Sequence, residues 1–340
     1  MWTEEYLDEL LTTPSAALTE DMAKVEGDII ILGAGGKMGP TLAALAVNAC
    51  KKAGVNKRII AVSRFGDPFA VALLKKIGVE IISMDMMEPG VLAQLPDVPN
   101  VIYMAGRKFG TDGQEHLTWA MNTWLPSLVA ERFRNSRIVV FSSGNVYPMM
   151  HIRDGGADET VAPGPIGEYG MSTLGRERMF EYASVTYGTP VCMYRLNYAV
   201  DLRYGVLNDI AQNILAGNPV PIYSPVVNCI WQGDANEVAL RCLHICESPA
   251  SFLNVTGPET VSVKWAAIEL GKHLGIEPII EEQDNVRETA LLNNAAKMCK
   301  LFGYPTVSLS QMIEWQALWL KAGGRLLNKP THFEERKGKF

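Results

Sequence analysis

Apolar and polar residues follow two alternating patterns along the chain from residue 28 onward. Short apolar runs are typical of strands buried on both faces of a sheet. Each run is followed by a longer segment with an apolar residue every three or four positions, which is typical of an amphipathic helix. The predicted strands cover residues 28–32, 58–62, 79–83, 100–105, 137–142 and 190–196. The predicted helices cover residues 40–53, 67–77, 88–95, 113–134 and 169–187.

A glycine-rich turn separates the first predicted strand from the first predicted helix, and Pro40 follows it. Proline in the first turn of a helix costs little, because its missing N–H would have no partner within the helix. Glycines at three-residue spacing let backbone N–H groups approach a pyrophosphate at the positive end of a helix. The order of strand, glycine turn and helix therefore predicts a dinucleotide site at Gly33, Gly35, Gly36, Lys37, Met38 and Gly39.

The alternation of strands and helices around this turn predicts an α/β fold. We expect a Rossmann-type, doubly wound parallel sheet with helices on both faces, and a smaller C-terminal substrate-binding lobe. A short helical segment is expected before the fold, and the polar tail is expected to be a loose end. The predicted parts are the extension (1–26), the dinucleotide-binding domain (27–200, with 229–256 returning to it), the lobe (201–228 and 257–327) and the tail (328–340).

Composition narrows the class of protein. The chain has 340 residues, of which 48% are hydrophobic and 20% charged, and no apolar run approaches the length of about 20 residues that spans a bilayer. The net charge of −6 argues against a nucleic-acid partner, and six scattered cysteines are expected to be reduced thiols in a soluble, cytoplasmic protein. Cys242, His244 and Cys246 are interpreted as core residues rather than a metal site, because a helix turns His244 away from both cysteines. We expect no metal.

The second strand ends in Ser63 and Arg64, where dinucleotide folds carry an acidic residue for the ribose 2′-hydroxyl. A missing carboxylate removes repulsion of a 2′-phosphate, and a guanidinium can pair with one. NADP is therefore predicted as the cofactor, with NAD as the alternative. Further cofactor contacts are expected at the ends of the third and fourth strands, at Asp85, Met86, Met104, Ala105 and Gly106.

Ser143 ends the fifth strand, and Tyr169 follows it 26 residues later at the start of a helix. These two side chains can meet over a nicotinamide ring, with the serine holding a carbonyl or hydroxyl oxygen and the tyrosine transferring the proton that accompanies a hydride. Cations on neighbouring loops suggest an anionic substrate, although Arg107 and Lys108 are equally well explained as ordinary loop charges. Arg195 lies in an apolar strand and is expected to be structural. The predicted substrate-binding residues are Arg107, Lys108, Asn145, Asn197 and Arg203.

Together these motifs resemble the NAD-dependent epimerase/dehydratase family of extended short-chain dehydrogenases/reductases over residues 28–325. The resemblance rests on Gly33-x-x-Gly36-x-x-Gly39, Met104-Ala105-Gly106, Asn122, the run from Ser142 to Tyr147, Tyr169, and Asn254-Val255-Thr256-Gly257. It implies that Ser143 and Tyr169 are catalytic, that Asn122 and Tyr169 belong to the cofactor site, and that two copies pair through the helices 113–134 and 169–187.

Two positions depart from the family pattern. The family motif is Tyr-x-x-x-Lys, whose lysine binds the nicotinamide ribose and lowers the pKa of the tyrosine, but Thr173 stands at the lysine position. Thr173, the third predicted catalytic residue, can form a hydrogen bond with a ribose hydroxyl but carries no charge. The candidates for supplying the missing positive charge are Arg176, Lys37, Arg107 and Lys108. Gly144-Asn145 replaces the Asp-Glu pair of the dehydratases, which argues against dehydration.

The sequence thus predicts an NAD(P)-dependent oxidoreductase or epimerase that acts on a hydroxyl or carbonyl group of a sugar-like, anionic small molecule. A nucleotide-sugar and a sugar acid both fit this description. The alternative is a cofactor-binding sensor or scaffold that has lost catalysis, which the absent lysine favours and the retained Ser143 and Tyr169 oppose.

Overall fold

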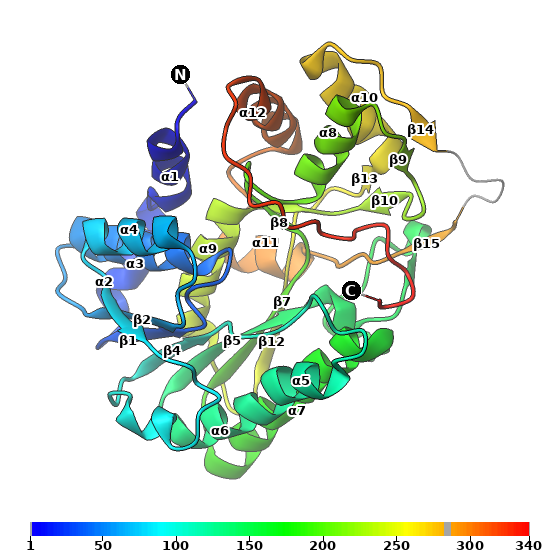
Figure 1. Cartoon of the computed structure of the whole chain (residues 1–340). Helices are drawn as coiled ribbons and strands as arrows, with labels where there is room; N and C mark the ends of the chain where they lie inside the picture. The colour runs from blue at the N-terminus through cyan, green and yellow to red at the C-terminus, as the bar shows by residue number, and fades with distance from the viewer. Residues whose placement is uncertain (1, 282–286, 340) are drawn as a thin grey trace.

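A computed structural model describes residues 2–281 and 287–339. Its centre is a seven-stranded sheet with the strand order β12-β7-β5-β4-β1-β2-β3, in which all neighbouring strands are parallel (Figure 1). The strand order reverses between β1 and β4, so the sheet is doubly wound and the predicted Rossmann-type fold is confirmed. The strands are β1 (Ile29–Leu32), β2 (Ile59–Ser63), β3 (Glu80–Ser83), β4 (Asn100–Tyr103), β5 (Arg137–Ser143), β7 (Val191–Leu196) and β12 (Ser251–Val255).

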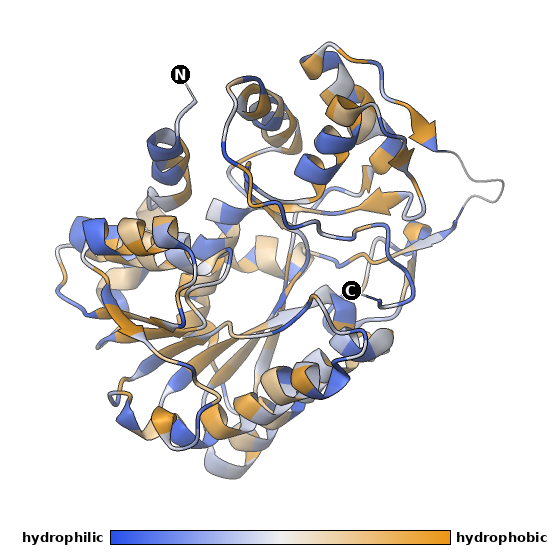
Figure 2. Cartoon of the chain, in the orientation of Figure 1, coloured by the Kyte–Doolittle hydropathy of each residue, from blue (hydrophilic) through white to orange (hydrophobic). Residues whose placement is uncertain are grey.

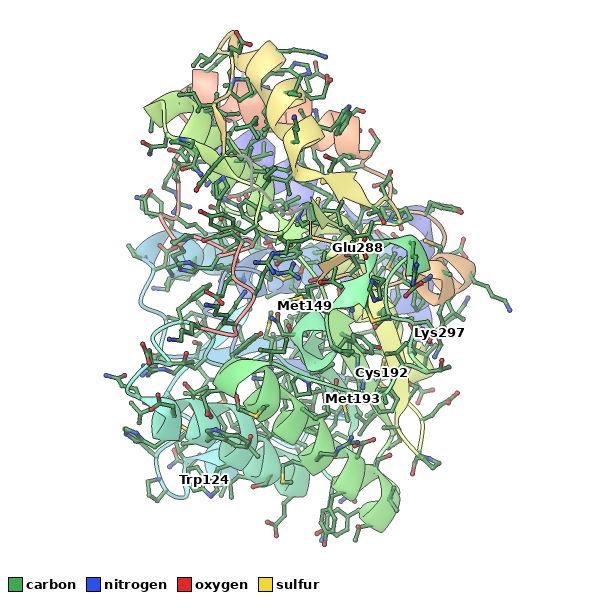
Figure 3. All side chains as sticks on the ribbon, turned by 90° about the vertical axis from the view of Figure 1, so that its right-hand side faces the viewer. Trp124, Met149, Cys192, Met193, Glu288 and Lys297 are labelled. Atoms are coloured by element: carbon green, nitrogen blue, oxygen red, sulfur yellow. The ribbon has the colours of Figure 1, made fainter. Side chains whose placement is uncertain are left out.

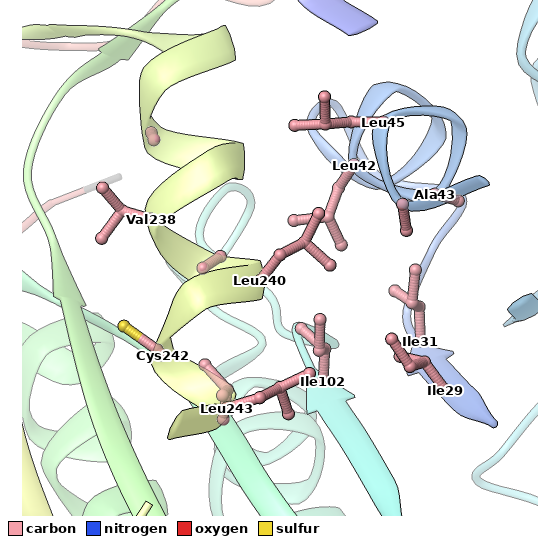
Figure 4. Packing of buried hydrophobic residues seen from close by; sticks show 14 of the residues in the cluster. Ile29, Ile31, Leu42, Ala43, Leu45, Ile102, Val238, Leu240, Cys242 and Leu243 are labelled. Carbon is pink, nitrogen blue, oxygen red and sulfur yellow. The ribbon is translucent and has the colours of Figure 1, made fainter. Parts of the chain in front are cut away.

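Helices cover both faces of the sheet, and this explains the unbroken apolar strands. Ile29 and Ile31 of β1 pack into one hydrophobic cluster with helices on one face, whereas Ile30 and Leu32 belong to a cluster on the other face. Figure 4 shows the first cluster, in which the β1 side chains meet leucines of α3 and α9. The covering helices are α3 (Gly39–Ala53), α4 (Pro68–Ile77), α6 (Leu125–Arg132), α7 (Gly167–Tyr187) and α9 (Gln232–Arg241).

Adjacent residues of β7 show the same division. Cys192 packs into the first cluster and Met193 into the second, and both are labelled in Figure 3. Figure 2 shows that the strands of the sheet are mainly hydrophobic, whereas the helices contain both hydrophobic and hydrophilic residues. No helix within the described ranges is long and apolar enough to cross a membrane.

Two predicted helices are wrong in extent. The segment 88–95 contains only the 3₁₀ turn η1 (Val91–Gln94), because Gly90 takes a left-handed conformation with φ of 75°. The segment 113–134 is interrupted by the π-helical turn η2 (Ala120–Trp124) between α5 (Glu115–Trp119) and α6. Pro126, which has no N–H to donate back along the helix, follows this turn directly.

A small lobe stands over the carboxyl ends of the sheet and has its own hydrophobic core (Figure 1). Its helices are α8 (Val206–Ala216), α10 (Val263–Leu274) and α12 (Leu309–Lys321). The short strand β6 (Met150–His151) pairs with β15 (Thr289–Ala290) and joins the sheet domain to the lobe. Two pairs lie within the lobe, β9 (Val220–Pro221) with β14 (Ile280–Glu281) and β10 (Val226–Val227) with β13 (Val261–Ser262), and β8 (Ala199–Val200) pairs with β11 (Ile230–Trp231). The remaining elements are α11 (Ala296–Phe302) and the 3₁₀ turns η3 (Gly144–Val146), η4 (Ile152–Asp154) and η5 (Cys242–Ile245).

The N-terminal extension connects the two hydrophobic cores. It forms α1 (Glu4–Thr12) and α2 (Ala16–Lys24). Leu7 and Leu11 of α1 pack into the core of the small lobe, whereas Leu18 and Met22 of α2 pack against the sheet domain. The extension is therefore an integral part of the fold.

The predicted loose tail is wrong. The segment 328–339, called here the C-terminal strap, is fixed to both parts of the molecule and crosses the region between them (Figure 1). The N–H and hydroxyl of Thr331 donate to Asp209 of α8 at 2.7 and 2.6 Å, and Phe333 is buried in the small-lobe core. Near its end, Arg336 donates to the carbonyl of Thr289 at 2.7 Å.

Candidate active site

A cavity of about 640 Å³ lies beyond the carboxyl ends of β1, β4, β5 and β7, under the small lobe. This is where ligands bind in doubly wound sheets. The predicted site residues that line it are Gly33, Gly36, Lys37, Met38, Met104, Gly106, Lys108, Ser143, Asn145, Tyr169 and Asn197. Its other wall residues are Phe109, Phe141, Ser142, Leu196, Tyr198, Ala199, Tyr204 and residues 328–332 of the C-terminal strap.

The glycine turn fits the pyrophosphate of a dinucleotide. Gly33 has φ of 92°, and a Cβ there would lie 2.5 Å from the backbone nitrogen of Ala105. A Cβ on Gly39 would collide with the backbone of Ala34, so this glycine allows the close packing of α3 on β1. A Cβ on Gly36 would have the Gly33 carbonyl oxygen as its nearest neighbour, at 3.5 Å. The cavity side of the turn is therefore open to a ligand.

The residues expected at the adenosine end lie at the ends of β2 and β3, outside the wall of this cavity. A Cβ on Gly35 would lie 2.6 Å from Ser63 Oγ, so the glycine turn touches the end of β2. The guanidinium of Arg64 is 71% exposed and lies 3.5 Å from the carboxylate of Asp85. Asp85 also accepts a hydrogen bond from the N–H of Met87 at 3.0 Å. Met86 and Ala105 are buried.

Ser143 and Tyr169 lie on the wall of the same cavity. Ser143 ends β5, and its Oγ donates to Asn145 Oδ1 at 3.1 Å and accepts from the Asn145 N–H at 3.2 Å. Tyr169 belongs to the first turn of α7, and the Nζ of Lys108 lies 5.7 Å from the centre of its ring. Two hydroxyl groups are thus presented to one space, next to the glycine turn.

A buried ionic network supports the end of β5. Arg195 donates to both carboxylate oxygens of Glu177, at 2.8 and 2.7 Å, and to the hydroxyl of Tyr147 at 2.7 Å. Ser142, the neighbour of Ser143, donates to the same carboxylate at 2.5 Å. Tyr147 in turn donates to Asn254 at 2.9 Å. The structural role predicted for Arg195 is confirmed.

Thr173 does not line the cavity. Its side chain is completely buried, and its Oγ1 has no hydrogen-bond partner within the described part of the chain. Arg176, one turn further along α7, is also buried and donates to the Phe141 carbonyl at 2.6 Å and to Asn122 Oδ1 at 2.9 Å. A Cβ on Gly106 would collide with this guanidinium. The positive charge of α7 therefore lies directly beneath the cavity floor.

Asn122 holds the loop after β4 from behind. It is fully buried; its Oδ1 accepts from the Arg107 N–H at 2.8 Å, and its Nδ2 donates to the Arg107 carbonyl at 2.8 Å and to Ser172 Oγ at 3.0 Å. The structure does not place this side chain at the cavity wall, where a cofactor contact would require it. Its role is to position the wall residue Gly106 and its neighbours.

Two predicted substrate cations lie elsewhere. Arg203 is buried in ion pairs with Asp201 at 2.9 Å, Glu4 at 2.9 Å and Asp8 at 3.0 Å, so it fixes α1 and its assignment to the substrate site is wrong. The Arg107 guanidinium turns back to the Gly110 carbonyl at 2.7 Å, and to Gln114, and does not reach the cavity. The sequence shows these charges but not the carboxylates or carbonyls that fold against them.

Three lysines line the cavity: Lys37 and Lys108, which belong to the predicted site, and Lys329 of the C-terminal strap. Burial, together with the charges of Lys108 and Lys329, lowers the pKa of Lys37 to about 7. Burial lowers the pKa of Lys108 to about 8, against the opposing charges of Asp209 and Glu334. Lys37 was expected in the glycine turn and as a candidate for the missing active-site charge, but not as a residue of the substrate side.

Some of the wall residues missed by sequence reasoning lie next to predicted ones at the strand ends, such as Phe109 and Phe141, whereas others belong to the small lobe and the C-terminal strap. Tyr204 precedes α8, and the strap residues lie more than a hundred positions further along the chain. For Tyr204, an aromatic residue directly after Arg203 was only a weak sequence signal. The strap has a polar composition, which is typical of mobile chain ends.

Comparisons with known proteins agree with this geometry. The model of the NAD dependent epimerase/dehydratase family matches residues 29–237. A search of curated proteins found no match. Among solved structures, the chain resembles a UDP-glucuronic acid 4-epimerase from Bacillus cereus in complex with UDP-glucuronic acid and NAD, with 19% identity, a TM-score of 0.70 and coverage of 87% of this chain and 99% of that one.

Two further solved structures share the fold. A UDP-glucose 4-epimerase from Thermotoga maritima with UDP-glucose is 16% identical with a TM-score of 0.70, covering 87% of this chain and 99% of that one. A dTDP-glucose 4,6-dehydratase from Bacillus anthracis with NAD is 16% identical with a TM-score of 0.72, covering 87% and 97%. These identities establish the common fold, and the family model covers more than half of the chain. The resemblance drawn from the motifs is thus confirmed, and the chain belongs to the NAD dependent epimerase/dehydratase family, a family of enzymes of the short-chain dehydrogenase/reductase type.

Proposed function

We propose that this protein is an NAD(P)-dependent oxidoreductase or epimerase that acts on a hydroxyl or carbonyl group of a sugar-like, anionic small molecule. The observation that carries the proposal is that the hydroxyls of Ser143 and Tyr169 share one cavity wall with the glycine turn. The solved structures of similar fold hold nucleotide-sugars and NAD, which supports a sugar-like substrate.

In the proposed reaction the nicotinamide cofactor, when bound, accepts or returns a hydride. During oxidation the Tyr169 phenolate accepts the proton of the substrate hydroxyl, and during reduction the Tyr169 hydroxyl donates that proton to the carbonyl oxygen. Ser143 Oγ keeps the hydrogen bond that it accepts from the Asn145 N–H, gives up its own bond to Asn145 Oδ1, and donates that proton to the same substrate oxygen. Gly33, Gly36, Met38 and the backbone of Lys37 would hold the pyrophosphate side of the cofactor, and Met104 and Gly106 would lie along its nicotinamide half.

For the cofactor we propose NADP over NAD. The support is the end of β2, where Ser63 and the exposed Arg64 offer no carboxylate to repel a 2′-phosphate. Asp85, 3.5 Å from Arg64, competes for the guanidinium, so the preference is expected to be moderate. NAD is the cofactor in the solved structures named above, and it is the alternative here.

We also propose a cytoplasmic homodimer. All six cysteines are free thiols, as expected for a reducing compartment. Large apolar side chains are exposed on the outer face of the layer formed by η2, α5 and α7, where Trp124 projects outward (Figure 3). Pairing of this face would bury them, and sedimentation equilibrium tests it. The exposed residues are Leu117, Trp119, Trp124, Met171, Tyr182 and Val185.

The test of function is a panel of sugar acids and UDP-sugars incubated with each cofactor. Oxidation or reduction is followed at the absorbance band of the reduced cofactor, and epimerisation, which leaves no net change in cofactor, is followed by chromatography of the products. We expect Tyr169→Phe to lower turnover by about 100-fold or more while cofactor affinity is unchanged, because only the proton transfer is removed. Turnover that is unchanged in this variant would refute the mechanism.

A second function is favoured by Thr173, which removes the charge that the family places beside the tyrosine. In that case the protein is a cofactor-binding sensor or scaffold. Tight cofactor binding without turnover on any member of the panel would establish this alternative.

A further inference from the structure

We propose that Lys37 and Lys108 form a subsite for the carboxylate of a compact substrate, a sugar acid or similar hydroxy or oxo acid that carries no nucleotide. The inference rests on the proposed function, because the subsite lies beside the proposed catalytic residues. It replaces the cation set expected from sequence, of which Arg107, Arg195 and Arg203 are used elsewhere in the fold.

Lys37 is directed from the glycine turn toward the substrate side of the cavity. Its Nζ lies 3.2 Å from the centre of the Tyr204 ring and 4.8 Å from that of Phe109. Within the described part of the chain no carboxylate comes within 4 Å of this ammonium group. A half-buried cation supported mainly by aromatic rings is electrostatically incomplete, and an anion bound beside it completes it.

Lys108 approaches the same space from the loop after β4. Its Nζ lies 5.4 Å from the Phe109 ring centre and 5.7 Å from the Tyr169 ring centre, so both lysines flank Phe109. Burial lowers the pKa of Lys37, and the charge of Lys108 lowers it further. Two like charges gathered at a cavity wall next to a catalytic tyrosine match one negative group on a ligand.

The C-terminal strap limits the size of that ligand. Residues 328–332 line the cavity, and the strap is fixed there by the two bonds from Thr331 to Asp209. Lys108 Nζ also donates to the Thr331 carbonyl at 3.3 Å, so the strap lies directly against the proposed subsite. A carboxylate close to the reacting carbon fits under it, whereas a nucleotide diphosphate requires the strap to leave.

Proton uptake is a second property of such a subsite. Bound anion raises the pKa values of Lys37 and Lys108, which lie at about 7 and about 8 in its absence. Affinity for a carboxylate therefore falls as the pH rises through these values, and binding near pH 8 takes up protons. The other ionisable groups facing the two lysines are Tyr169, Tyr204, Asp209, Lys329, His332 and Glu334.

The test is calorimetric binding of glucuronate, galacturonate, glucose, UDP-glucose and UDP-glucuronic acid to the full chain saturated with reduced cofactor. We expect one of the free acids to bind and glucose to bind at least tenfold more weakly, with Lys37→Met and Lys108→Met each weakening the acid by roughly tenfold or more. Arg153→Met, which removes the same charge from an 81% exposed side chain outside the cavity, is the matched control and should change little. Repeating the titration in buffers of different ionisation enthalpy should show proton uptake.

Four results would overturn the subsite. The first is that neither free acid binds, and the second is that UDP-glucose binds better than the free acids and loses its affinity in the lysine variants. The third is that Lys37→Met weakens binding of the cofactor as much as binding of the acid. The fourth is that Arg153→Met has the same effect as the lysine variants. Because binding is read without turnover, lysine-dependent acid binding without any reaction would disprove the proposed function alone.

Discussion

The Arg195–Glu177 ion pair should be the most costly single interaction to break near the active site. Both side chains are almost fully inaccessible, with exposures of 4% and 0%. Burial on its own lowers the pKa of Arg195, but the Glu177 carboxylate reverses the effect and raises it, which shows that each charge depends on the other. In Arg195→Met the carboxylate of Glu177 keeps only the Ser142 hydroxyl as a hydrogen-bond partner within the described part of the chain.

Removal of one member of a buried ion pair costs about 3–5 kcal/mol, because an uncompensated charge is left inside the protein. This is a large share of the 5–15 kcal/mol, roughly, by which folded domains are stable. Replacing both partners, in Arg195→Met with Glu177→Leu, removes both charges and should recover most of the loss. About 1–3 kcal/mol of cost remains, because the hydroxyls of Ser142 and Tyr147 lose partners.

Urea unfolding followed by circular dichroism measures these differences as changes in midpoint at constant m-value. The control is Arg58→Met, which breaks a bidentate pair with Glu80 of similar length, 3.0 and 2.9 Å, but at exposures of 52% and 43%. Such an exposed pair contributes little to stability, because water and salt screen its charges. The reasoning is refuted if Arg195→Met costs no more than Arg58→Met, or if the double variant is no more stable than Arg195→Met.

Three further predictions concern individual charges. Arg64→Ala should weaken NADP by about tenfold and leave NAD unchanged in fluorescence titrations, because only the 2′-phosphate loses a partner; equal loss for both cofactors would contradict this. Lys37→Met should raise the thermal midpoint of the ligand-free protein below pH 7. The pKa of Lys37 is about 7 in the folded protein and near 10.5 in the unfolded chain, so the wild type gains stability as the pH rises between these values. The stability advantage of the variant should therefore vanish near pH 10.5. A difference in thermal midpoint that does not depend on pH would be inconsistent with a buried charge as its cause. Thr173→Lys should lower the urea midpoint, and adding Arg176→Met should restore part of it; equal stability of Thr173→Lys and the wild type would show that the two positions are independent.

The parts of this protein that the sequence predicts well are those determined by local pattern. Ile29 to Leu32 are apolar because both faces of β1 are covered, and Gly33 is required because its φ is positive and Ala105 is too close for a side chain. The strand ends then follow from the topology of a parallel sheet, so Ser143 and Tyr169 could be placed at one cavity from their positions alone.

The parts that could not be predicted depend on partners distant in sequence. Arg203 and Lys37 are both cations near strand ends, yet the first is enclosed by carboxylates of α1 and the second faces aromatic rings in the cavity. The C-terminal strap is polar like a mobile tail, but the bonds from Thr331 to Asp209 and the burial of Phe333 fix it. Local composition carries no information about either arrangement.

The missing family lysine is best understood together with Arg176. Side chains three positions apart are neighbours on a helix, so a lysine at position 173 would bring a second cation against the buried Arg176 guanidinium. At about 6 Å and an effective dielectric constant near 20, two such charges repel by roughly 3 kcal/mol. Thr173 avoids this repulsion, and within the described residues no carboxylate lies within 4 Å of Arg176 to relieve it.

The position of Arg176 also shows how the presence of Thr173 in place of the family lysine changes the charge around the cavity. Its guanidinium lies against Gly106, whose missing side chain is what admits it, and Gly106 is part of the cavity floor. A positive charge on α7 is therefore retained beneath the cavity floor, and the backbone of Gly106 separates it from the cavity. The chain has lost the direct contact that the family lysine makes with the cofactor ribose, and it has kept a positive electrostatic field on the same side of the site.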